Sequence, residues 1–134
     1  MVKTRKIILI LSLISIYSYS QNNGLKNFHT NLKYNSVYTI DLDTQKSDFL
    51  NYFDTNIIFD INENGSGKII IYYQTKLLFF IKKNYKVNYS SGSGTYFFVT
   101  DNGSILRLGV SPYNDPGAFS LVLKNNTTIT FTNK

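Results

Sequence analysis

Polar and apolar side chains alternate along residues 36–43, and this is the clearest pattern in the chain. Tyr38, Ile40 and Leu42 fall on one side of an extended backbone, while Val37 and three polar residues fall on the other. Because successive side chains of a strand point to opposite faces, this segment is predicted to be a half-buried β-strand.

Similar short apolar segments recur through the rest of the chain, and turn signals separate them. Asn102-Gly103 is the strongest of these signals, because both residues tolerate the positive φ that a tight hairpin requires. Lys83-Asn84 and Asn125-Asn126 are interpreted as two further turns. The strands predicted in this way are residues 56–61, 68–73, 77–82, 85–90, 95–101, 104–110, 118–124 and 127–132.

The spacing of the turns determines the predicted fold class. Turn signals about every eight to twelve residues, without a long helical period, are typical of all-β sandwiches and barrels. The chain is therefore predicted to be all-β with at most one short helix. The expected architecture is an antiparallel meander of about eight to nine strands, forming a small barrel or a two-layer sandwich.

Two segments do not follow this pattern. Residues 44–54 place Phe49 beside Leu50 and fit either a short helix or a strand; a short helix or irregular crossover is favoured. Residues 21–35 are polar and rich in Asn, and are predicted to be a flexible N-terminal arm. A single β domain is then expected over residues 36–134.

The N-terminus has the features of a secretory signal peptide. Lys3, Arg5 and Lys6 precede an apolar run over residues 7–16, and Ser18-Tyr19-Ser20 forms a small-x-small cleavage site. The run is much shorter than the roughly 20 residues of a membrane-spanning helix. Residues 1–20 are therefore predicted to be removed on export to a bacterial periplasm or the extracellular space. A membrane span is not expected, and neither is a lipid anchor, since the chain has no cysteine.

Charge gives little indication of a nucleic-acid partner. The predicted signal carries three cations and no acid, so its removal lowers the formal net charge from +6 to +3. The basic cluster Lys82, Lys83 and Lys86 surrounds a predicted turn and is interpreted as a solvated hairpin end. A nucleic-acid-binding role is not expected.

The residues needed for catalysis or metal binding are scarce. With no cysteine and one histidine, His29, the chain cannot provide the usual zinc ligands or a thiol nucleophile. Asp60, Asn62 and Asn64 resemble the start of a calcium loop, but Ile71 occupies the twelfth position, where a bidentate acid is required. The sequence therefore predicts no metal, no cofactor and no enzymatic activity.

Residues 69–73, 77–81 and 96–99 are apolar on both faces of the predicted strands. Such strands are either covered on both sides within the fold or expose a binding face. The favoured hypothesis is a non-enzymatic protein that engages a protein partner through an aromatic β-face or the loop that carries Tyr113. The candidate contact residues are Tyr72, Tyr73, Tyr113 and Asn114.

A small apolar ligand is the alternative to a protein partner. The chain would then be a lipocalin-like barrel with aromatic side chains lining its interior. This likeness rests on strand number, because the chain has no tryptophan and so lacks the Gly-x-Trp opening of such barrels.

Overall fold

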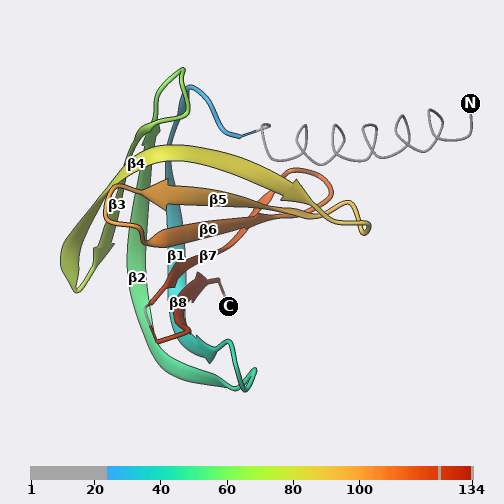
Figure 1. Ribbon diagram of the computed structural model, residues 1–134. Coiled ribbons are helices and arrows are strands. Elements are labelled where there is room, and N and C mark those ends of the chain that lie inside the picture. The colour runs from blue at the N-terminus through green and yellow to red at the C-terminus, as the bar shows by residue number, and fades with distance from the viewer. Residues whose placement is uncertain (1–23, 124, 134) are drawn as a thin grey trace, which may run out of the picture.

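The computed structural model describes residues 24–123 and 125–133, and these form a closed antiparallel β-barrel (Figure 1). Each strand pairs with its neighbours in sequence, and the last strand closes the barrel against the first. The all-β prediction is confirmed, and of the two predicted architectures the barrel is the one observed. The predicted signal peptide, residues 1–20, lies outside the described residues.

The barrel contains eight strands of unequal length. β1, β2 and β4 are roughly twice as long as the others and extend beyond their neighbours at their ends. The strands are β1 (Phe28–Asp41), β2 (Ser47–Ile61), β3 (Gly67–Tyr73), β4 (Thr75–Asn88), β5 (Gly94–Thr100), β6 (Ile105–Val110), β7 (Pro116–Val122) and β8 (Thr127–Thr132).

The arm predicted over residues 21–35 is wrong for residues 28–35, which form the first half of β1 and pair with β2. Phe28, Leu32 and Tyr34 face the interior in alternation with exposed polar residues, and Tyr34 is only 5% exposed. The burial of these side chains holds the segment in the barrel, so the β domain begins before residue 36.

The short helix favoured for residues 44–54 is also wrong, because β2 starts at Ser47. Val37 of β1 pairs with Asn51, while Tyr38 pairs with Phe49, so Leu50 is an extra residue in the ladder. Such a β-bulge interrupts the two-residue alternation. This interruption explains why Phe49 and Leu50 are adjacent apolar residues without belonging to a helix.

The turn predicted at Lys83-Asn84 does not exist, since both residues lie within β4. A further register shift occurs here: Ile81 pairs with Thr100, whereas Lys83 pairs with Val99. The predicted strands 77–82 and 85–90 are therefore one bent strand. This gives eight strands rather than nine.

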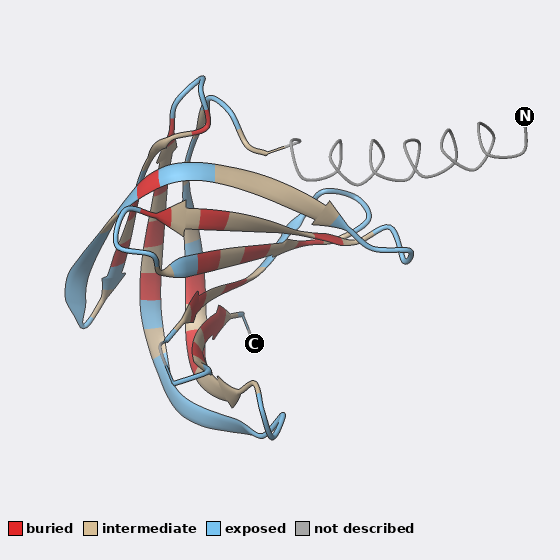
Figure 2. Cartoon of the chain, viewed as in Figure 1, coloured by how far each residue is buried: buried red, intermediate tan, exposed pale blue. Residues whose placement is uncertain are grey.

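Packed aromatic side chains fill the centre of the barrel. The ring of Phe59 lies 5.8 Å from that of Phe98 and 5.5 Å from that of Phe119, centroid to centroid, and all three side chains are at most 1% exposed. Buried positions alternate along the strands, as Figure 2 shows. The aromatic residues of the central interior thus form a close-packed core.

Candidate functional site

A group of apolar side chains is exposed on the outer side of β2, β3 and β4. The strand register aligns Ile58, Ile70 and Leu78 in one row across the three strands. Tyr72 and Phe80 lie two positions away on the same side of their strands. Phe80 is 56% exposed, Leu78 44% and Tyr72 40%. We call these five residues the apolar face; Figure 2 shows exposed positions along the β3–β4 hairpin.

Two lysine residues lie at the edge of the apolar face. Lys76 pairs with Tyr72 and Lys68 pairs with Phe80 in the ladder between β3 and β4. The carboxylate of Asp60 also lies at this edge, 2.6 Å from Nδ1 of His29 and 4.0 Å from Nζ of Lys68. The rim of the apolar face therefore carries charges of both signs, because Asp101 also lies beside Phe80, where its backbone N–H donates to the carbonyl of Phe80 at 3.0 Å.

Tyr72 and Tyr73 point to opposite sides of β3, as the alternation predicted. Tyr72 is part of the apolar face, whereas the ring of Tyr73 lies 5.1 Å from that of Phe53 and 5.6 Å from that of Phe131. Tyr73 therefore packs against the core, and of this pair only Tyr72 is on the exposed side of β3.

The other two predicted contact residues lie in the loop between β6 and β7. Tyr113 is 86% exposed at the tip of this turn. Ser111 organises the turn, because its hydroxyl oxygen accepts hydrogen bonds from the backbone N–H groups of Tyr113 and Asp115, both at 3.2 Å. Asn114 lies 3.5 Å from Lys86 near the end of β4, whereas the apolar face lies near its beginning. The structure thus does not bring Tyr72 together with Tyr113 and Asn114.

An apolar pocket of about 380 Å³ opens at the end of the barrel where Asn114 lies. We call it the mouth pocket. The side chains that line it come from the inner face of β1, β5 and β6, from the start of β7, from the β6–β7 loop and from the segment before β1. They are Leu25, Phe28, Thr30, Leu32, Tyr96, Leu108, Val110, Asn114 and Pro116.

Of this group, only Asn114 was among the contact residues predicted from the sequence, which places residues 21–35 in an arm. The signal that could have found the β1 residues is the strand-like alternation of Phe28, Thr30, Leu32 and Tyr34 with polar residues. Burial raises the pKa of Tyr96 above its ordinary value, since the charged phenolate loses solvation there.

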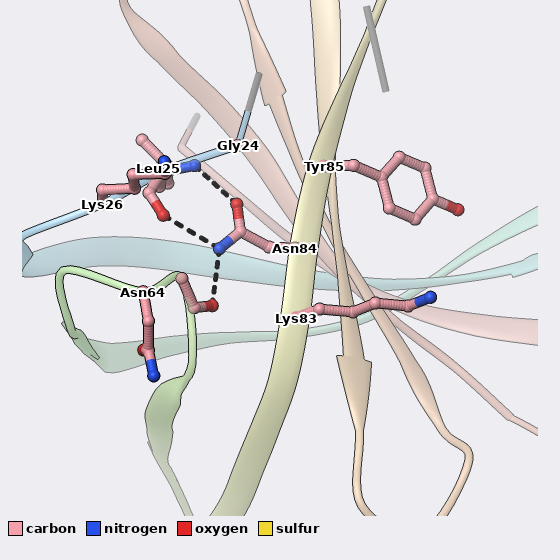
Figure 3. A pocket seen from close by; sticks show the side chains of 8 residues that line it. Gly24, Leu25, Lys26, Asn64, Lys83, Asn84 and Tyr85 are labelled. Carbon is pink, nitrogen blue, oxygen red and sulfur yellow. Dashed lines mark hydrogen bonds between the residues drawn. The ribbon is translucent and has the colours of Figure 1, made fainter. Parts of the chain in front are cut away.

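A second, polar pocket lies where the segment before β1 crosses β4 (Figure 3). The side-chain amide of Asn84 accepts a hydrogen bond from the backbone N–H of Leu25 and donates to the carbonyl groups of Leu25 and Gly65. Lys83 and Tyr85 point away from Asn84 in Figure 3. The polar groups of Asn84 are used to join three parts of the backbone, so we interpret this pocket as structural.

The described residues offer little catalytic or metal-binding chemistry. His29 and Asp60 form a pair on the exposed surface, and no group of three His, Asp or Glu side chains comes together in residues 24–123 and 125–133. Over the same residues there is no helix with the length and apolar character needed to cross a bilayer.

In comparisons with known proteins, no protein family, curated protein or solved structure matches the chain.

Proposed function

We propose that this chain is an exported, non-enzymatic binding protein that recognises a protein partner through the apolar face. The observation that carries the proposal is the exposure of Tyr72, Leu78 and Phe80 beside Ile58 and Ile70 on three adjacent strands. Contiguous apolar surface of this kind is uncommon on monomers and often marks a binding site.

The chemistry of the surface supports a protein partner. Aromatic and aliphatic side chains provide the desolvated centre of such an interface. Lys68 and Lys76 lie at its edge, where they would accelerate association with an acidic surface.

The apolar face is favoured over the Tyr113 loop for a physical reason. Tyr113 offers one large exposed side chain in a tight turn, while the apolar face offers five neighbouring side chains on a rigid sheet. Binding energy concentrates where anchors are clustered and water can be excluded around them. Tyr113 is therefore the matched control in the test below.

Site-specific photocrosslinking tests the proposal in the native host. A photoreactive phenylalanine analogue would replace Phe80 in one variant and Tyr113 in another, and adducts would be identified by mass spectrometry. We expect a specific protein adduct from position 80 and not from position 113. The partner would then be titrated with purified protein. The double variant Leu78→Ser and Phe80→Ser should bind about tenfold or more weakly, and Ile105→Ser, on another exposed position, should bind as the wild type does.

Salt dependence tests whether Lys68 and Lys76 contribute to binding of the partner. Affinity for the partner should fall as salt concentration rises, because exposed charges are screened. The proposal is overturned if the same adducts form at both positions, or if the double variant retains full affinity. It is also overturned if the adduct at position 80 is a second copy of this chain.

Export is the remaining part of the proposal and has a separate test. Lys3, Arg5 and Lys6 before the apolar run, with the small residues near position 20, support cleavage after Ser20. Intact-mass analysis of the native protein should find Gln21 at its N-terminus. Protein that retains Met1 and stays in the cytoplasm would rule out export.

A further inference from the structure

The mouth pocket lies where the barrel wall is not closed by strand pairing. β1 pairs with β2 from Phe28 onward, but its pairing with β8 begins only at Ser36. The first half of β1 therefore has one edge without a strand neighbour among the described residues. The hydroxyl of Tyr34 donates a hydrogen bond to the carbonyl of Gly117 at 2.7 Å and joins β1 to β7 at the base of this opening.

The walls of the pocket are suited to an apolar molecule. Phe28 and Leu32 both lie on the inner side of β1. Leu108 and Val110 line the same pocket from β6. The volume of about 380 Å³ is near the lower end of the range of about 300–1,000 Å³ for small-molecule sites. The pocket thus fits a small ligand with an apolar body.

A cation is held at the edge of this pocket by the bulge in β4. After the register shift between Ile81 and Lys83, Lys86 pairs with Tyr96 and shares its inner side of the barrel. Its side chain crosses Gly94, where an added Cβ would lie 2.8 Å from Cε of Lys86. Nζ of Lys86 is 5.4 Å from the ring centre of Tyr96 and 3.5 Å from Oδ1 of Asn114. Tyr96 and Asn114 both line the pocket.

The contacts of Lys86 leave its ammonium group able to bind an anion. An ammonium group has three donors, and here it has one long contact to an amide oxygen and one to an aromatic face. Across the part of the chain that the structure describes, the ion pairs are those of Asp60, so no carboxylate oxygen lies within 4.0 Å of Nζ of Lys86. A ligand carboxylate would form a stronger, charge-assisted hydrogen bond than either contact.

We infer that the mouth pocket binds a small amphipathic monocarboxylate. Its apolar body lies between Phe28, Leu32 and Leu108, and its carboxylate meets Nζ of Lys86, with the side-chain amide of Asn114 as a second donor. This site is separate from the apolar face, and a protein that binds a partner there can hold such a ligand independently.

Calorimetric titration with sodium decanoate, below its micellar concentration, tests this inference. Saturable binding at one site is expected, and decanol, which has the same chain without the charge, should bind more weakly. Lys86→Met should lower the affinity for decanoate about tenfold or more and leave that for decanol unchanged. The double variant Leu78→Ser and Phe80→Ser should bind decanoate as the wild type does, which separates this inference from the proposed partner surface.

Chemical-shift mapping on the wild-type protein locates the ligand without any substitution. Decanoate should perturb the amides of Phe28, Tyr96 and Val110 more than those of the apolar face. Absence of saturable decanoate binding, equal affinity in the wild type and Lys86→Met, or perturbations confined to the outer surface would each overturn the inference.

Discussion

The side chain of Asn84 holds Leu25, a residue 59 positions earlier in the chain, through hydrogen bonds to both its backbone N–H and its carbonyl. A third hydrogen bond joins Asn84 to the carbonyl of Gly65. One amide group thus fixes the segment before β1 and the β2–β3 turn to the middle of β4. Because Leu25 also lines the mouth pocket, this contact positions part of its wall.

Asn84→Ala should therefore loosen the segment before β1. The variant leaves backbone groups of Leu25 and Gly65 without their partner, so we expect a loss of about 1–3 kcal/mol in the free energy of unfolding. Hydrogen exchange of the Leu25 amide should accelerate more than exchange in the central strands. Asn31→Ala, at an exposed position, is the control. Unchanged exchange at Leu25 would show that other contacts hold this segment.

Tyr72 and Tyr73 should respond unequally to substitution by alanine. Tyr73→Ala removes ring contacts with Phe53 and Phe131, and should cost about 2–4 kcal/mol because the side chain is partly buried. Tyr72→Ala, on the exposed face, should change stability by less than about 0.5 kcal/mol. Urea denaturation of the two variants measures this difference. Equal, large losses would mean that the outer side of β3 is covered within the chain.

Gly94 and Lys86 should be energetically coupled. A methyl group at position 94 would approach Cε of Lys86 to 2.8 Å and the carbonyl of Val87 to 3.0 Å. Gly94→Ala should therefore destabilise the fold by about 1–3 kcal/mol, and part of this loss should disappear in a Lys86→Ala background. A double-mutant cycle by chemical denaturation gives the coupling energy. If Gly94→Ala costs the same in both backgrounds, Lys86 does not lie across this position.

Tyr34 should make the barrel sensitive to alkali. Burial raises the pKa of Tyr34 above its ordinary value of 10.0. Above pH 10 the unfolded chain releases this proton while the folded chain retains it, so stability is present below about pH 10 and falls as the pH rises further. Each pH unit of this differential titration corresponds to about 1.4 kcal/mol.

Tyr34→Phe isolates this contribution from that of the lysines. The variant loses the hydrogen bond to Gly117 and should be about 1 kcal/mol less stable at neutral pH. Its stability should nevertheless decline less steeply than that of the wild type between pH 10 and 12. Tyr113→Phe, at a tyrosine that is 86% exposed, is the control and should follow the wild-type profile. Parallel profiles for Tyr34→Phe and the wild type would contradict the assignment.

Regular hairpins could be predicted from the sequence, because local residue pattern determines them. The turn at Asn102-Gly103 is present, and its Gly has a φ of 84°. β3 lies at the predicted residues 68–73 with one further residue, Gly67, at its start. In these places the alternation and the turn chemistry agree with the final pairing.

The irregular parts could not be predicted because they depend on pairing with distant strands. The bulge at Leu50 breaks the alternation, and the bulge at Lys82 moves Lys86 to the inner side of the barrel. Neither bulge can be recognised from the sequence, because pairing with the partner strand determines the register. The candidate ligand site depends on this second bulge, so the sequence analysis identified Asn114 but interpreted Lys86 as part of a solvated turn.

The closure of the barrel has a kinetic consequence. Ser36 of β1 pairs with Thr132 of β8, 96 positions later in the chain, and the hydroxyl of Ser36 also donates to the carbonyl of Thr132. The seven other pairings join consecutive strands and can form locally, but this one must wait for nearly the whole chain and loses the entropy of closing a long loop. The last of the described strands therefore completes the barrel, and until it pairs, the second half of β1 keeps one edge open to pairing with other chains.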